Sequence, residues 1–449
     1  MNQWIAIHNA FDPFESVPAE KLEAWYVERP HSPLRPLLNE LRPEKTPSRT
    51  ILVGHPSSGK STELTKLATE LGKQNEYFVV RIDLDQNLDI ERANPVEVIF
   101  LMGAAIYKVA AAQLDKKPDP SRLEQLKKGL ETLVQTHTGN RDFSLNVSDL
   151  LENLVCFGAS LIAGPVGKTV ANLANKVIRP FRFVSGTDKE VVRKLEVEPK
   201  IETLVEALNS IVADVQEKAG KPLVLIVDGL DKPYDPDIIA LNFAERNYLS
   251  KPACRVVYAA PMWVYYSSRF AAVRQRFPVL EFPNIKLYER RKRQRNTRAG
   301  KRQSMSRRKR DEHGFQVMRE IVNKRLGALG LMPDKVIETT ALDRLIHASG
   351  GVVRDLIRLI RDVASDAEIA GASSITKKLA EKAVARLRRQ YEAQLLPKDR
   401  EILVKVHQTH QRTDDEICDL LLQGNFVLSY VNDEVWFDTH SLLQPFADE

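Results

Sequence analysis

Nine consecutive residues constrain this chain more than any others. Residues 54–62 read Gly-His-Pro-Ser-Ser-Gly-Lys-Ser-Thr, which matches the phosphate-binding pattern G-x-x-x-x-G-K-[ST]. The glycines allow a tight bend in which backbone N–H groups turn toward a polyphosphate. In such a loop Lys60 reaches the β- and γ-phosphates, and the Ser61 hydroxyl ligates Mg²⁺. We therefore predict a site for ATP and Mg²⁺ formed by Gly54, His55, Pro56, Ser57, Ser58, Gly59, Lys60, Ser61 and Thr62.

The residues around this loop favour a nucleotide site over a chance match. Residues 50–53 are a short, apolar, β-branched run that is typical of a strand. Residues 61–71 carry apolar side chains at the helical period, so a helix should leave the loop and add its dipole to the anion site. A second run, Gly-Pro-Val-Gly-Lys-Thr at 164–169, imitates the end of the pattern, but its first required glycine falls at Ile162. We interpret this second run as a decoy.

An acidic residue at the end of a buried strand completes a nucleotide site of this kind. Residues 223–227 are apolar at every position, as in a central strand of a parallel sheet, and Asp228 follows them. We predict that Asp228 holds Mg²⁺ through water, opposite Ser61. Asp231 is placed to orient or deprotonate the attacking water, so we expect it to be catalytic together with Lys60. The alternative is that Asp231 only caps the next helix.

Further strands alternate with helices along the chain. This alternation predicts an α/β fold, in which right-handed crossovers build a parallel sheet. Residues 115–200 are less regular, and we interpret them as a helical insertion. Within them, the apolar run 154–164 is too short to span a bilayer and predicts a buried helix. We expect strands at 77–84, 255–260 and 280–287, and helices at 95–114 and 201–219.

Bulk composition narrows the class of protein. A chain of 449 residues has room for about two to four domains, and 43% apolar with 28% charged residues is ordinary for a globular protein. The three cysteines (Cys156, Cys254 and Cys418) lie far apart, which favours a reducing compartment over a disulfide framework or a zinc site. The first residues lack the basic start and apolar core of a signal peptide. We therefore expect a cytoplasmic protein with no stable membrane span.

The positive charge is concentrated in one segment. Residues Arg290 to Arg310 include twelve Lys or Arg residues and no acid, so the net charge of +6 would fall to −6 without these twelve. Such a tract can bind nucleic acid phosphates, an acidic partner or anionic lipid. Its lack of aromatic residues argues against base stacking. The alternative is a solvated insertion loop.

A helical region follows. Residues 314–375 form a helical pattern that is broken by Ser-Gly-Gly at 349–351, and Arg354 comes just past the break. An arginine in this position can contact the γ-phosphate and convert hydrolysis into domain movement. The alternative is a surface arginine that pairs with Asp355 or Asp362.

The last part of the chain has the pattern of a winged-helix domain. We expect helices at 376–393, 397–409 and 413–424, followed by a hairpin at 426–438. A winged helix often binds DNA, but four acids on the last helix repel phosphates and favour a protein-contact or autoinhibitory role. These acids are Asp414, Asp415, Glu416 and Asp419.

Four features together resemble a known group of proteins. The loop at 54–64, the strand ending Val-Asp-Gly-Leu-Asp, the Ser-Gly-Gly-x-x-Arg-Asp-Leu segment and the winged-helix tail are similar to bacterial STAND-type ATPases. These are related to the NACHT and KAP groups and, more distantly, to the AAA+ initiator ATPases. The resemblance covers most of residues 20–445. The chain departs from the group at Pro261, where many members carry a polar sensor residue, and it lacks KAP-style membrane spans.

The resemblance implies an α/β fold with a parallel-sheet P-loop NTPase core, a helical lid and a C-terminal winged-helix domain. It assigns ATP-site roles to Lys60, Ser61, Asp228 and Asp231, and the position of the lid's sensor arginine to Arg354. The implied domains are an N-terminal lead-in (1–45), the ATPase core (46–289, with the insertion at about 115–200), a basic loop (290–313), the lid (314–375) and the winged helix (376–449).

Three functions remain open from the sequence. The first is an ATP-hydrolysing regulatory switch that forms a homo-oligomer and controls a separate effector protein, as in bacterial defence against phage. The second is a DNA-engaging AAA+ loader or transposition-type ATPase, in which the basic tract lines a DNA path. The third is a scaffold that holds nucleotide without hydrolysing it.

Overall fold

The computed structural model describes residues 2–138, 146, 151–158, 200–245, 247–268, 270–290, 308–413, 416–431 and 434–444. Its centre is a six-stranded sheet formed by β1 (Arg49–Gly54), β2 (Phe78–Asp83), β3 (Cys156–Gly158), β4 (Leu223–Asp228), β5 (Arg255–Pro261) and β6 (Val279–Phe282). The strand order is β3-β2-β4-β5-β1-β6. All neighbours are parallel except β3, which is antiparallel to β2. The predicted α/β class with a parallel P-loop core is confirmed.

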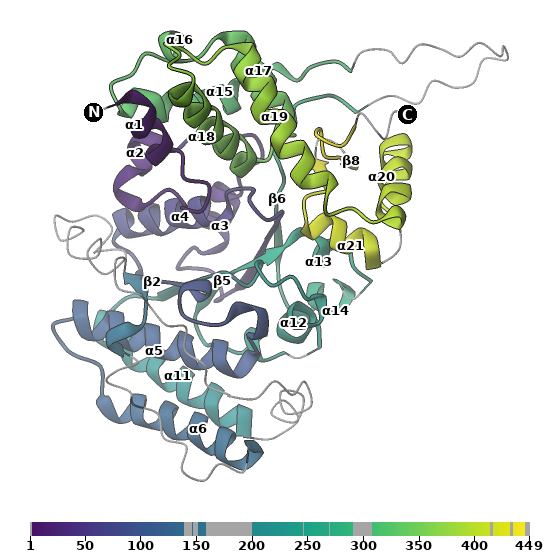
Figure 1. Ribbon diagram of the computed structural model, residues 1–449. Coiled ribbons are helices and arrows are strands. Elements are labelled where there is room, and N and C mark those ends of the chain that lie inside the picture. The colour runs from purple at the N-terminus through teal and green to yellow at the C-terminus, as the bar shows by residue number, and fades with distance from the viewer. Residues whose placement is uncertain are drawn as a thin grey trace.

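Helices cover both faces of this sheet (Figure 1). One face packs against α3 (Leu34–Glu40) and α4 (Lys60–Gln74), and the other packs against α5 (Pro95–Gln113). Outside α5 lie α6 (Pro120–Thr138) and α11 (Lys200–Ala219). Because both faces are covered, all six residues of β4 are buried, which explains the continuous apolar run in the sequence.

The helix α5 is apolar on nearly all sides. Among the described residues it is the one helix whose length and hydropathy would allow it to cross a membrane, with 19 residues and a mean hydropathy of 1.6. However, 78% of the 18-residue stretch that gives this hydropathy is buried inside the fold, against the sheet and the helices α6 and α11. The apolar sequence of α5 is therefore that of a central core helix.

Two predicted elements are corrected by the structure. The run 154–164 was expected to be helical, but residues 156–158 form the edge strand β3, because both backbone polar groups of Val155 bond to the Asn87 side chain and align this segment with β2. The last predicted strand, 280–287, ends at Phe282, since Pro283 has no N–H to donate to the sheet. Residues 159–164, the decoy run at 164–169 and residues 291–307 of the basic tract lie outside the described part of the chain.

The C-terminal half of the chain is mostly helical. The described elements are α15 (Glu312–Ala328), α16 (Pro333–Val336), α17 (Thr339–Ala348), α18 (Val353–Ile369), α19 (Lys377–Glu392), α20 (Pro397–Thr409), α21 (Glu416–Gln423), β7 (Val427–Val431) and β8 (Val435–Thr439). The helix α19 packs against α17 and α18, and the N-terminal helix α1 (Gln3–Ala10) also packs against α18 (Figure 1). The predicted tail helices and hairpin are present. We refer to residues 397–444 as the C-terminal module.

A glycine turn connects the helical region to the segment that follows β6. Gly351 has a φ of +85°, and its carbonyl accepts a hydrogen bond from the Ile285 N–H at 3.3 Å. A Cβ at this position would lie 1.8 Å from the Ile285 carbonyl oxygen, so only glycine fits. The turn places the first residues of α18 next to the phosphate-binding loop, where the Arg354 N–H donates to the Ser57 carbonyl at 3.3 Å.

We predict that Gly351→Ala destabilises the protein by at least about 2 kcal/mol, because a left-handed backbone angle and a backbone clash act together. The matched control is Gly371→Ala. It has a φ of +60° but nothing within 4 Å of the new Cβ, so it should cost only about 1 kcal/mol. Urea unfolding of both variants measures the difference. Equal losses would show that the contact with Ile285 does not fix the turn.

Candidate nucleotide site

The phosphate-binding loop connects the carboxyl end of β1 to the start of α4. Two of its residues adopt left-handed backbone angles, Ser57 at φ +69° and Gly59 at φ +100°, which turn the chain sharply. Because α4 begins at Lys60, the first N–H groups of this helix lack intrahelical partners and can bind an anion. A Cβ at Gly54 would lie 2.8 Å from the Phe282 carbonyl oxygen, so a side chain does not fit. The shape of the loop suits a polyphosphate.

The Lys60 side chain is buried and fully engaged. Its Nζ donates to the carbonyl oxygens of Gly54 and His55, both at 2.7 Å, and lies 2.8 Å from Asp231 Oδ2. Burial lowers the pKa of Lys60, and the Asp231 carboxylate opposes that shift. A phosphate that enters the loop must therefore compete with Asp231 for this ammonium group. The geometry joins the lysine of the loop to the acid that the sequence marked as catalytic.

Asp228 lies at the end of β4 and is fully buried. Arg81 of β2 donates to its Oδ2 at 3.0 Å, whereas its Oδ1 has no hydrogen-bond partner among the described residues. Burial by itself would raise the pKa of Asp228, but the charges of Arg81 and Lys232 and the nearby Ser61 hydroxyl hold it below its usual value. Asp228 is therefore a carboxylate with one oxygen atom unused.

This set of donors fits Mg²⁺. The free carboxylate oxygen of Asp228 and the Ser61 hydroxyl are hard oxygen ligands of the type that Mg²⁺ prefers. No group of three or more His, Cys, Asp or Glu residues could hold a metal ion within the part of the chain that the structure describes. Phosphate oxygens and water would complete the coordination sphere, which is the usual situation for Mg²⁺.

The sequence reasoning missed Arg81, Asp83 and Lys232, three charged residues beside Asp228. Asp83, at the end of β2, pairs in register with Asp228. Lys232 Nζ lies 3.3 Å from Asp83 Oδ1 and 2.8 Å from Asp85 Oδ2. Burial and the charge of Asp228 raise the pKa of Asp83. Arg81 and Asp83 were visible as polar residues in an otherwise apolar strand, which was the available signal.

Arg354 lies in the first turn of α18, against the loop. Burial lowers the pKa of its guanidinium, and Asp231 is the charge that most strongly opposes this shift. In contrast, Arg358 is the residue that approaches Asp355, at 3.9 Å. The position of Arg354 therefore favours the alternative in which it faces the nucleotide site over the one in which it pairs at the surface.

The C-terminal module bonds directly to the phosphate-binding loop. His55 Nε2 accepts the Ser429 N–H at 2.9 Å, so Nδ1 carries the proton and donates to the Leu422 carbonyl at 3.3 Å. The Asn425 side chain donates to the Pro56 carbonyl at 3.0 Å. His55 and Pro56 were predicted as loop residues that contact nucleotide, and in the structure the His55 ring and the Pro56 carbonyl contact the module.

The module also contacts the acidic segment that follows β4. Gln423 Nε2 donates to the carbonyl oxygens of Asp231 and Pro233, at 3.1 and 3.0 Å. Tyr430 donates from its hydroxyl to the Gly350 carbonyl at 2.7 Å. The module thus holds the loop, the acidic segment after β4 and the glycine turn at the same time.

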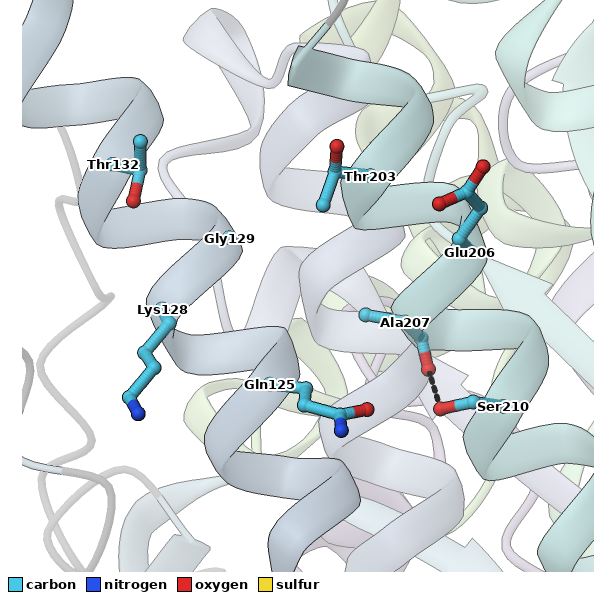
Figure 2. Close-up of a pocket in the computed structure, with 8 residues that line it drawn as sticks. All are labelled: Gln125, Lys128, Gly129, Thr132, Thr203, Glu206, Ala207 and Ser210. Atoms are coloured by element: carbon cyan, nitrogen blue, oxygen red, sulfur yellow. Dashed lines mark hydrogen bonds between the residues drawn. The ribbon is translucent and has the colours of Figure 1, made fainter.

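A separate hollow of about 480 Å³ lies between α6 and α11, on the outer side of α5 (Figure 2). Figure 2 shows that the Ser210 hydroxyl is directed to the Ala207 carbonyl of its own helix and that Lys128 points away from α11. No residue of the phosphate-binding loop lines it. Its lining consists of Gln125, Lys128, Gly129, Thr132, Thr203, Glu206, Ala207 and Ser210.

The sequence matches no protein-family profile and no curated protein. Among solved structures, the chain is similar to the Aeropyrum pernix ORC1 protein in complex with DNA (TM-score 0.39, 12% identity, 98% of this chain and 96% of that one). It is also similar to the Aeropyrum pernix ORC2 protein in its ADP form (TM-score 0.42, 12% identity, 98% and 97%). A third likeness is to the Thermotoga maritima RuvB Holliday junction branch migration motor (TM-score 0.26, 16% identity, 50% and 78%). These TM-scores lie below 0.5 and therefore support no conclusion about function.

The buried ion pair gives a stability prediction. Lys60→Met should destabilise the protein by about 3–5 kcal/mol, because it leaves the Asp231 carboxylate buried beside an apolar group. Adding Asp231→Asn should recover part of this loss, so that the double variant loses less than the sum of the single variants. Urea unfolding without nucleotide measures the three values. Strict additivity would contradict a direct interaction.

The loop histidine gives a pH prediction. Burial lowers the pKa of His55 to about 3, with Lys60 adding to the effect, so the folded chain leaves this ring neutral where the unfolded chain protonates it. Below pH 6.5 the unfolded chain gains a proton on His55 that the folded chain does not bind. The free energy of unfolding is therefore highest above pH 6.5 and declines as the pH falls toward 3. Between pH 7 and pH 5 the wild type should lose about 2 kcal/mol more than His55→Gln does. Parallel pH profiles would contradict a buried neutral histidine.

Proposed function

We propose that this protein is an ATP-binding and ATP-hydrolysing regulatory switch. The observation that carries the proposal is that the C-terminal module is bonded to the phosphate-binding loop itself and to the backbone of Asp231. A loop that must accept a polyphosphate cannot change its contacts without affecting a module that is held by the same residues. The assignment to STAND-type ATPases, related to AAA+ proteins, is part of this proposal.

The chemistry follows from the exchange of partners at Lys60. ATP binds with its phosphates on the loop amides and on Lys60 Nζ, which releases the Asp231 carboxylate. Asp231 then orients or deprotonates the attacking water. Ser61 and, through water, Asp228 would hold Mg²⁺, and the ion would supply positive charge to neutralise the phosphates. Arg354 enters from α18 and contacts the γ-phosphate.

The same exchange drives the switch. Asp231 is linked to the module through its carbonyl, which accepts the Gln423 amide, so movement of the Asp231 segment weakens that contact. We therefore assign the docked arrangement to the resting state and the released module to the ATP state. A winged-helix domain in this role contacts protein, in agreement with the acidic residues on α21.

Linkage makes this proposal testable without knowledge of a partner. If docking and ATP binding oppose each other, variants that weaken docking must bind ATP more tightly. Gln423→Ala and Asn425→Ala each remove contacts to the site and should raise the affinity for a non-hydrolysable ATP analogue by about five- to tenfold. Gln411→Ala, at an exposed amide of the same module, is the control and should leave the affinity unchanged. Isothermal titration calorimetry measures the three constants.

Two results would contradict the proposal. Unchanged affinity in both docking variants would separate the module from the nucleotide site. Absence of any binding in the wild type, with Lys60→Met behaving identically, would remove the nucleotide site altogether. A third result, turnover that is the same in the wild type and in Asp231→Asn, would favour the scaffold that binds nucleotide without hydrolysing it.

The proposed setting is a homo-oligomer that acts on a separate effector protein, as in antiphage defence. It is supported by the resemblance and by the lack, among the described residues, of a cluster of metal-ligating side chains that could perform a second reaction. Particle mass measured with and without ATP–Mg²⁺, together with the products of neighbouring genes, tests it. A chain that stays monomeric and without partner in both conditions would contradict it.

A DNA-engaging ATPase is the second candidate, and one observation favours it. The described ends of the basic tract are fixed to the C-terminal hairpin, where Arg290 pairs with Glu434 at 2.7 Å and Arg308 pairs with Asp438. The tract therefore leaves and re-enters the fold beside the module. Salt-sensitive DNA binding that disappears when residues 291–307 are deleted would support this candidate.

A further inference from the structure

A segment near the N-terminus lies against the phosphate-binding loop. Residues 26–32 have no regular secondary structure, yet they contact the first turn of α4. The Tyr26 hydroxyl lies 3.3 Å from both carboxylate oxygens of Glu63, and the Ser32 hydroxyl donates to the same carboxylate. Glu63 itself is buried. The segment is therefore fixed to the start of the helix that carries Lys60.

Within this segment, Arg29 reaches the loop backbone. Arg29 is 8% exposed, and the central carbon of its guanidinium lies over the Phe282 ring, 3.6 Å from the ring centroid. One terminal nitrogen donates to the Ser58 carbonyl, and the other donates to the Pro283 carbonyl at 2.9 Å. Burial lowers the pKa of Arg29 to about 10, with Glu63 opposing the shift, so the group stays charged at neutral pH.

The bond to the Ser58 carbonyl determines the direction of the next amide. In a trans peptide the C=O and the following N–H point in opposite directions. Since the Ser58 carbonyl points to Arg29, the Gly59 N–H must point away from Arg29, to the other side of the peptide plane. Gly59 has a φ of +100°, and glycine allows many other backbone angles as well. The loop by itself therefore does not fix the orientation of the Ser58–Gly59 peptide.

We propose that Arg29 is a positioning residue for nucleotide binding, which holds the Ser58–Gly59 peptide so that the Gly59 N–H is presented to the β-phosphate. The inference rests on the proposed function, since it assigns a role toward the nucleotide of the same site. Arg29 makes no contact with the phosphate. It acts through the backbone of the loop, and it makes the shape of the loop depend on the N-terminal segment.

The planar fork of arginine explains why this residue type is needed. Arg29 bridges two carbonyl oxygens from different segments, that of Ser58 in the loop and that of Pro283 after β6, while its guanidinium lies over the Phe282 ring. A lysine ammonium presents its donors from a single atom and has no planar face, so it cannot reproduce the fork of two separate nitrogens together with the contact on the ring. Arg29→Lys should therefore behave much more like Arg29→Met than like the wild type.

The test separates positioning from general stability. The variants are Arg29→Lys and Arg29→Met, and the control is Arg255→Met. Arg255 is also buried (4% exposed) and donates only to backbone carbonyls, those of Arg42, Pro43 and Lys45, at the start of β5 and therefore at the end of the strands opposite to the loop. All three proteins are assayed for ATP turnover, for binding of ADP–Mg²⁺ and for urea unfolding.

We expect both Arg29 variants to raise KM for ATP and Kd for ADP about 10- to 100-fold with kcat nearly unchanged, because loop amides bind the ground state and the transition state alike. Arg255→Met should lower stability without changing KM or Kd. The proposal is overturned if the Arg29 variants lose stability like Arg255→Met but keep the wild-type Kd, or if Arg29→Lys restores wild-type binding. If the proposed function is wrong, the result is different, because wild type and Lys60→Met would then both fail to bind nucleotide. The inference about Arg29 would be wrong in that case as well.

Discussion

The structure depends on how one buried positive charge is compensated. An ammonium group that is removed from water is unfavourable unless hydrogen bonds and a counter-charge replace its hydration. Lys60 meets this requirement with two loop carbonyls and the Asp231 carboxylate, all within 2.8 Å. The residue that we propose to bind phosphate and the residue that we propose to act on water are therefore each other's partners. In the proposed function, phosphate binding, catalysis and conformational change are linked through this contact.

The loop that carries Lys60 is held by segments from distant parts of the chain. The N-terminal segment contacts it through Arg29, the glycine turn before α18 brings Arg354 to Ser57, and the C-terminal module contacts His55 and Pro56. Since these contacts meet at the loop, we propose that a nucleotide bound there would affect all three segments.

The sequence allowed the elements of the core to be predicted because their causes are local. The glycine pattern marked the loop, the run before Asp228 marked a central strand, and helical periodicity marked α4. The bounds of α5 and of the tail helices were close to the predicted ones for the same reason. The strand β3 was missed because a pattern of three residues is too short to distinguish an edge strand from a helix. Hydrogen bonds between the Asn87 side chain and the Val155 backbone align this segment with β2.

The contacts between segments could not be predicted in the same way. His55 and Ser429 are separated by 374 positions, and neither residue type indicates such a partner. Arg29, Arg81 and Lys232 are ordinary charged residues in the sequence, and their contacts arise only from packing that buries the two arginines and leaves Lys232 half-buried. The site was therefore predictable as a set of motif residues, whereas the groups that hold and neutralise that set were not.

Hydrogen exchange at the module tests the central claim most directly. The Ser429 amide is protected by His55 Nε2, so its exchange rate reports docking of the module on the loop. Our account predicts that saturating non-hydrolysable ATP with Mg²⁺ speeds exchange in residues 423–429, and that Lys60→Met abolishes this response. Exchange that stays equal or slows when nucleotide is demonstrably bound would contradict it.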